Sequence, residues 1–142
     1  MPRTFWLPLL ALALLLPACG PAGRKPVYPV AGQVLDGEDK PAAGALVVFH
    51  PVEAGDPNAV KPLAYVDDVG KFALTTYDQG DGAPEGEYVV TIEWRPRNPN
   101  PFAPDKEGPD RLRGRYSDPK TSQLRFRVER KPDNAMPPVR LR

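Results

Sequence analysis

The chain contains one cysteine and one histidine, the side chains most often used for covalent and metal chemistry. Cys19 supplies the single thiol, so no disulfide can form within the chain and the thiol is open to modification. His50 has no second histidine with which to share a metal ion. A zinc site usually takes three or four His, Cys or carboxylate ligands, so we interpret His50 as a structural residue.

Other residue types that carry chemistry are similarly isolated. Asp67-Asp68, and Asp78 with Asp81, could suggest calcium, but their spacing lacks the alternating carboxylates and terminal glutamate of a calcium loop. Aspartates in such glycine-rich segments commonly cap turns, which is what we expect here. The serines and threonines have only His50 as a triad partner. We therefore predict no enzyme activity, no metal and no other cofactor.

The thiol of Cys19 stands at the end of an apolar leader. Residues 5–16 form an apolar run of 12 residues behind Arg3. A transmembrane helix needs roughly 20 apolar residues, whereas a signal-peptide core needs roughly 7 to 15 after a positive start. Residues 1–18 are therefore predicted to be a secretion signal.

The end of this leader, Leu16-Pro17-Ala18-Cys19, resembles the bacterial lipobox: an aliphatic residue, two smaller positions and cysteine. The resemblance implies that Cys19 receives a diacylglycerol on its sulfur and becomes the first residue of the mature chain. The alternative is a plain secreted protein with an incidental cysteine near the cleavage site. Gly20 is not the aspartate that retains some lipoproteins in the inner membrane. We expect export, a lipid anchor in the cell membrane or outer membrane, and a domain facing the periplasm or exterior.

Charge and composition indicate the class of domain that follows. The whole chain has 19 Lys and Arg against 18 Asp and Glu, and loss of Arg3 with the leader makes the two counts equal. A nucleic-acid binder usually shows a basic excess, so nucleic acid is not a predicted partner. Proline is abundant, with 20 residues, but apolar residues still cluster in strand-like runs. These features indicate a folded, loop-rich, all-β domain.

The pattern along the chain gives a tether, residues 19–27, and a sandwich domain, residues 28–142. Segments with β-branched and aromatic residues, separated by Gly, Pro and Asp turns, predict about seven short strands. The segments are 28–36, 44–52, 62–67, 71–77, 85–94, 123–129 and 137–142. We therefore predict a seven-stranded Ig-like or prealbumin-like β-sandwich after the signal peptide.

The alternation within these segments predicts which side chains enter the core. In the second segment, Ala45, Val47 and Phe49 share the face opposite Leu46, Val48 and His50. In the fifth segment, Tyr88, Val90, Ile92 and Trp94 are expected inward, and Glu87, Thr91 and Glu93 are expected to face solvent. Gly70 is expected to take a positive φ in a hairpin turn.

Residues 95–122 have six prolines and no sustained pattern, apart from a possible turn of helix at 110–116. So long a loop in a compact domain is usually functional or disordered. Its basic residues exceed its acidic ones by three. Two interpretations remain open: a recognition surface for an acidic partner or glycan, or a loop packed onto the sandwich with its charges solvated. The candidate binding residues are Trp94, Phe102, Arg111, Arg113, Arg115 and Tyr116.

Four spacing patterns occur in order after residue 28: V-x-G-x-V, G-x-x-x-P-x-x-G-A-x-V-x-F, D-x-x-G-x-F-x-L and P-x-G-x-Y-x-V-x-I. Their fixed positions are Val30, Gly32, Val34, Gly37, Pro41, Gly44, Ala45, Val47, Phe49, Asp67, Gly70, Phe72, Leu74, Pro84, Gly86, Tyr88, Val90 and Ile92. With these patterns the domain resembles the carboxypeptidase regulatory-like domain, a transthyretin-like (prealbumin-like) β-sandwich.

That resemblance implies a fold more than a function, since one fold hosts many roles. The related hydroxyisourate hydrolases use a histidine-and-arginine site and a Tyr-Arg-Gly-Ser ending, and this chain has neither. We expect a lipid-anchored envelope sandwich acting as a non-catalytic interaction or structural module, with the membrane and an envelope protein or glycan as partners. The alternative is a carbohydrate- or peptidoglycan-binding module.

Overall fold

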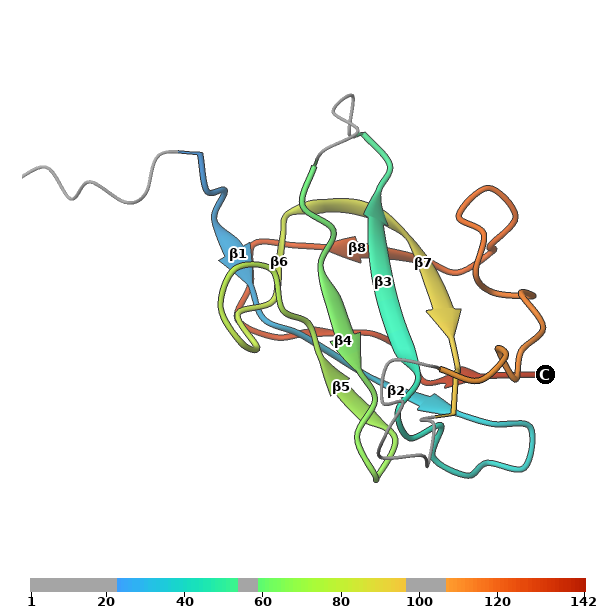
Figure 1. Ribbon diagram of the computed structural model, residues 1–142. Coiled ribbons are helices and arrows are strands. Elements are labelled where there is room, and N and C mark those ends of the chain that lie inside the picture. Colours follow the sequence, from blue (N-terminus) through green and yellow to red (C-terminus); the bar gives the residue numbers. More distant parts are fainter. Residues whose placement is uncertain (1–22, 54–58, 97–106) are drawn as a thin grey trace, which may run out of the picture.

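The computed structural model describes residues 23–53, 59–96 and 107–142 (Figure 1). The leader, Cys19 and Phe102 lie outside these residues. All regular elements in the described part are strands, so the predicted all-β class is confirmed. The strands are β1 (Val27–Tyr28), β2 (Val30–Leu35), β3 (Leu46–Pro51), β4 (Leu63–Tyr65), β5 (Lys71–Ala73), β6 (Ala83–Pro84), β7 (Gly86–Glu93), β8 (Arg125–Val128), β9 (Asn134–Ala135) and β10 (Val139–Arg140).

Two main sheets build the sandwich. One has the antiparallel order β4-β3-β7-β8, and the other has β10-β2-β5, with β9 also pairing parallel to β2. An isolated bridge between Leu63 and Thr75 links the two sheets at the β4–β5 edge. A small third sheet pairs β1 with β6. The described residues form ten strands against the predicted seven: Pro29 divides the first segment into β1 and β2, and the other two additional strands, β6 and β9, have only two residues each.

The core lies where the inward faces of the two sheets meet. The register places Val47 opposite Ile92 and Phe49 opposite Val90, and all four are fully buried. The Phe49 ring lies 5.6 Å from that of Tyr88 and 6.0 Å from that of Phe126, centre to centre. The predicted shared face of Ala45, Val47 and Phe49 is confirmed, and it is the face that enters the core.

The outward face of β7 differs from the prediction. Thr91 was expected to face solvent, but only 4% of its surface is exposed. Its hydroxyl lies 2.9 Å from Nε2 of His50 on the neighbouring strand β3, which gives the buried oxygen a hydrogen-bond partner. The prediction that Thr91 faces solvent was therefore wrong. Alternation shows which side chains share a face of the strand, but it does not show whether other residues cover that face.

The turn chemistry follows the expected pattern. Gly70 has φ +83° in the β4–β5 hairpin, as predicted. One carboxylate oxygen of Asp67 accepts hydrogen bonds from the backbone N–H groups of Val69 and Lys71. The carboxylate of Asp81 accepts from the N–H groups of residues 76, 77 and 78. Both aspartates therefore cap turns, and no cluster of three or more His, Cys, Asp or Glu occurs among the described residues.

Candidate functional site

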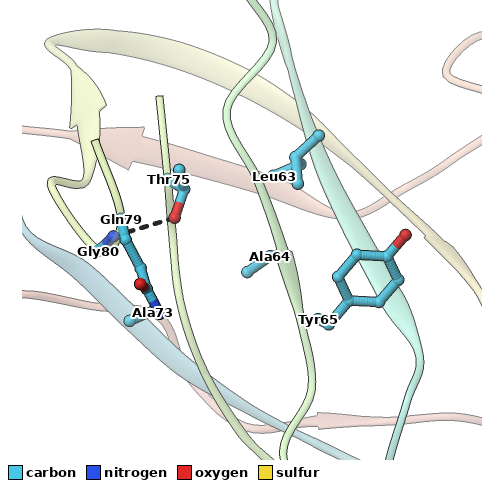
Figure 2. Close-up of a pocket in the computed structure, with 7 residues that line it drawn as sticks. All are labelled: Leu63, Ala64, Tyr65, Ala73, Thr75, Gln79 and Gly80. Carbon is cyan, nitrogen blue, oxygen red and sulfur yellow. Dashed lines mark hydrogen bonds between the residues drawn. The ribbon is translucent and has the colours of Figure 1, made fainter. Parts of the chain in front are cut away.

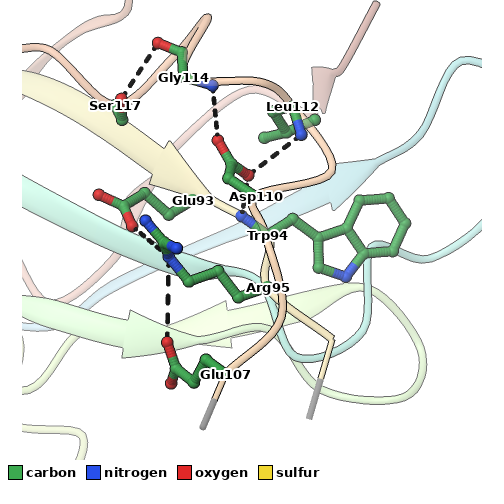
Figure 3. A network of polar contacts seen from close by, with 8 residues as sticks. All are labelled: Glu93, Trp94, Arg95, Glu107, Asp110, Leu112, Gly114 and Ser117. Atoms are coloured by element: carbon green, nitrogen blue, oxygen red, sulfur yellow. Dashed lines mark hydrogen bonds and ion pairs between the residues drawn. The ribbon is translucent and has the colours of Figure 1, made fainter. Parts of the chain in front are cut away.

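Asp110 organises the loop that follows β7 (Figure 3). One carboxylate oxygen accepts hydrogen bonds from the N–H groups of Trp94 at 2.9 Å and Leu112 at 3.1 Å, and the other accepts from Gly114 at 2.9 Å. Burial raises the pKa of Asp110, but these hydrogen bonds lower it by more, and the nearby Arg95 lowers it further. The net pKa lies below its usual value, so the carboxylate stays ionised and holds the loop against the end of β7.

Replacing Asp110 with alanine is expected to destabilise the loop by about 2 kcal/mol, because three backbone donors lose their acceptor. Asp110→Asn keeps one acceptor oxygen and should lose less. Because the folded-state pKa is depressed, this stabilisation is present above the unfolded pKa of about 3.9 and disappears as pH falls through the folded pKa. Urea unfolding at neutral and acidic pH tests this. A parent–Asn difference that does not shrink in acid would contradict it.

The turn of helix predicted for residues 110–116 is replaced by consecutive tight turns. The N–H groups of Arg113 and Arg115 donate to carbonyls three residues earlier, at 3.0 and 3.1 Å. Arg113 and Gly114 have φ values of +53° and +73°, which a right-handed helix cannot contain. The exposed side chains of Arg111, Arg113 and Arg115 therefore extend from a backbone whose conformation is fixed by its hydrogen bonds to Asp110.

The structure brings the candidate binding residues into two groups. The Arg111 guanidinium lies 4.8 Å from the centre of the Trp94 ring, and the Trp94 indole N–H donates to the Ala43 carbonyl at 2.9 Å. Arg115 donates to the backbone carbonyl of Arg142, whose own N–H donates to the hydroxyl of Tyr116 at 3.1 Å. Trp94 and Tyr116 also pack against the core, so the aromatic members are structural supports.

Arg113 belongs to neither group. Its side chain is exposed and makes no hydrogen bond or ion pair with any residue of the described ranges. Phe102 lies outside these ranges, so its place in the candidate set stays a prediction. Sequence reasoning missed the roles of Asp110 and Arg142, although an aspartate before a glycine-containing turn is a recognisable capping signal.

The acidic side chains around this loop are already engaged. Arg95 Nε lies 3.0 Å from Glu93 Oε2 and 3.9 Å from Glu107 Oε2. The hydrogen bond and charge of Glu93 raise the pKa of Arg95. Asp118 accepts a hydrogen bond from the N–H of Lys120 at 2.8 Å. The exposed positive side chains of the loop are Arg111, Arg113, Arg115 and Lys120, and its exposed carboxylates are Glu107 and Asp118.

A second candidate site is a groove between β4 and β5, of about 620 Å³ (Figure 2). Tyr65 and Leu63 on β4 are 62% and 40% exposed, although both are large and apolar. Thr75 accepts a hydrogen bond from the N–H of Gly80 at 3.0 Å. The lining residues are all uncharged: Leu63, Ala64, Tyr65, Ala73, Thr75, Gln79 and Gly80. This groove was not predicted, since it depends on how two sheets meet at an edge.

His50 lies apart from both sites. Burial, followed by the positive charge of Lys61, lowers the pKa of His50. With its hydrogen bond to Thr91, it fits the predicted structural role. In the described part of the chain, no helix is long and apolar enough to cross a membrane.

Comparisons of this chain with known proteins found a similarity in structure but no matching family model. No family model matches it, and no curated protein does. It is similar in structure to a 9R-lipoxygenase from Cyanothece PCC8801, with a TM-score of 0.44 and 13% sequence identity. The match covers 81% of this chain but only 16% of the lipoxygenase chain.

Proposed function

We propose that this protein is a lipid-anchored, non-catalytic interaction module of the bacterial cell envelope. The anchor rests on the sequence: Cys19 follows a signal-like apolar run and completes a lipobox-like tetrad. Two or more acyl chains hold a protein stably on a bilayer, whereas one does not. The resemblance to the carboxypeptidase regulatory-like domain belongs to this proposal, and it concerns turn and core positions such as Gly70 and Phe49.

The anchor is tested by fractionating cells that produce the Cys19→Ser variant. The parent is expected in the membrane pellet, and the variant in the soluble or secreted fraction. A matched Val69→Ala variant, which shortens an exposed side chain and keeps Cys19, should fractionate like the parent. A Cys19→Ser protein that stays in the pellet would refute the lipid anchor.

The observation that carries the interaction role is that charged side chains of the 107–122 loop differ in whether they have partners within the domain. The carboxylates of the loop accept hydrogen bonds from backbone N–H groups or pair with Arg95, and Arg113 makes no side-chain hydrogen bond or ion pair with a described residue. Arg111, stacked on Trp94, is held in place at little entropic cost. Arginine next to a packed aromatic residue is typical of protein interfaces, and positive charge favours an acidic partner.

In-cell cross-linking of the membrane-bound protein tests this role. We expect one reproducible acidic protein partner, and its yield should fall about tenfold or more when Arg111, Arg113 and Arg115 are changed to alanine. The matched control is Arg127→Ala, Arg130→Ala and Lys131→Ala, which removes three exposed positive charges elsewhere. An equal fall in cross-linking yield in both triple variants would mean that overall positive charge, and not the loop, attracts the partner. An unchanged yield in both variants would refute the loop as the binding surface.

A second function, glycan binding, is favoured by the groove. Its volume lies in the range of small-ligand sites, roughly 300 to 1,000 Å³. A groove lined by an exposed tyrosine, the amide of Gln79 and the hydroxyl of Thr75 suits a neutral sugar. Co-sedimentation with purified cell-wall glycan tests it: binding should be lost in Tyr65→Ala and retained in Val69→Ala, which truncates another exposed apolar residue. Failure of the parent to co-sediment would eliminate this candidate.

A further inference from the structure

The first described residues of the chain are fixed to one end of the sandwich. Nη1 of Arg24 lies 3.3 Å from Oδ2 of Asp78, and its guanidinium lies 5.0 Å from the centre of the Tyr77 ring. The N–H of Lys25 donates to the Tyr77 hydroxyl at 3.1 Å. The ion pair is exposed and contributes little alone, but together the three contacts fix where the chain joins the domain.

The next residues strengthen this attachment. In β1, Val27 pairs with Pro84 and Tyr28 with Ala83, both antiparallel. Tyr28 also packs against the core. A Cβ on Gly82 would lie 1.8 Å from the Tyr28 carbonyl oxygen, so β1 sits directly against the turn before β6. The segment predicted as a lipidated tether, residues 19–27, is therefore attached to the domain from Arg24 onward.

This attachment shortens the chain between a lipid on Cys19 and the domain. Five residue steps separate Cys19 from Arg24, and fully extended they span at most about 17 Å. The 107–122 loop lies at the opposite end of the sandwich from β1 (Figure 1). β7 connects the two ends: it begins beside β6 and ends before Trp94, whose N–H donates to Asp110 of the loop. Its eight residues, at about 3.3 Å each, separate the two ends by about 26 Å.

The two lengths limit how the domain can stand on the bilayer. With Arg24 attached, the reach of about 17 Å is shorter than the separation of about 26 Å, so the domain cannot stand inverted, with the arginine loop on the bilayer and β1 above it. If β1 detached as far as Pro29, ten steps would reach about 35 Å and this inverted position would become possible. The contacts of Arg24, Lys25 and β1 therefore restrict which end of the domain meets the bilayer.

We propose that the end of the sandwich formed by β1, β6 and residues 76–82 faces the lipid surface, and that the attached tether prevents the inverted position in which the 107–122 loop would lie beneath the domain. This rests on the proposed lipid anchor at Cys19. It narrows the partner of the loop to a molecule that approaches from the aqueous side of the bilayer rather than to its lipid headgroups.

The test uses the lipidated full-length mature protein in vesicles of phosphatidylethanolamine and phosphatidylglycerol that carry a headgroup quencher. Because the lipid occupies the Cys19 sulfur, Gln79→Cys or Arg113→Cys supplies the one thiol for a fluorophore. We expect quenching several-fold stronger at position 79 than at 113. Inserting about twelve Gly and Ser residues after Gly20 should raise quenching at 113 towards that at 79. Equal quenching at both sites in the parent would overturn the orientation.

A second measurement separates the attachment from the anchor. If the protein does not float with vesicles, the proposed anchor fails, and the attachment is then judged by hydrogen exchange of the Lys25 amide. We expect this amide to be protected in the full chain and to exchange about three- to tenfold faster in Tyr77→Phe, which lacks the accepting hydroxyl. An amide that exchanges at the unprotected rate in the parent would overturn the attachment itself.

Discussion

Changing Gly82 to alanine is expected to separate β1 from β6 and to lower the free energy of unfolding by about 3 kcal/mol or more. The new Cβ would lie 1.8 Å from the Tyr28 carbonyl oxygen and 2.4 Å from its carbon, and no side-chain rotation can relieve a clash between backbones. The φ of +98° adds strain, since side chains rarely adopt it. Chemical denaturation measures the loss.

Gly80→Ala is the matched control for this prediction. Gly80 also has a positive φ, +72°, but a Cβ there would meet no atom within 4 Å. It should cost only the conformational strain, about 1 kcal/mol. If the two alanine variants were equally stable, the close contact between Gly82 and β1 would be wrong. Gly82→Ala should also increase the Lys25 amide exchange rate, which links this turn to the orientation on the membrane.

Changing Phe49 to alanine is expected to lower the free energy of unfolding by about 3–5 kcal/mol, the usual range for a buried phenylalanine. Its side chain is fully buried between the sheets and contacts the rings of Tyr88 and Phe126. Small domains are stable by about 5–15 kcal/mol, so this one change removes a large part of the total. Thermal or urea unfolding measures it.

Tyr65→Ala is the control for Phe49→Ala, because it also removes an aromatic ring. Tyr65 is 62% exposed on the outer side of β4, so its loss should change stability by less than about 0.5 kcal/mol. A similar loss in both variants would mean that Tyr65 is covered in solution. A small loss in Phe49→Ala would contradict the position of the core.

The sequence was sufficient to predict what depends on local pattern. The alternation around Val47 and Phe49, and the turn at Gly70, follow from strand geometry and φ preferences, and the structure has them as expected. Thr91 was misplaced: it is buried, and its hydrogen-bond partner His50 is 41 residues away. Contacts over such separations leave no periodic signal in the sequence.

The candidate sites also combine features that the local sequence predicts with features that depend on contacts between distant segments. The charge excess of the long loop was visible in the sequence, but the role of Asp110 in fixing it depends on Trp94, 16 residues earlier. The groove beside Tyr65 arises only where β4 of one sheet meets β5 of the other. The attachment of Arg24 to Tyr77 and Asp78 likewise joins segments more than fifty residues apart.

Intact mass spectrometry of the protein extracted from membranes tests the central claim most directly, because the anchor, the short tether and the orientation all depend on Cys19. We predict a chain that begins at Cys19, lacks residues 1–18 and carries the added mass of a diacylglycerol, with or without a further acyl group. A mature chain that begins elsewhere, or one with an unmodified Cys19, would contradict the account.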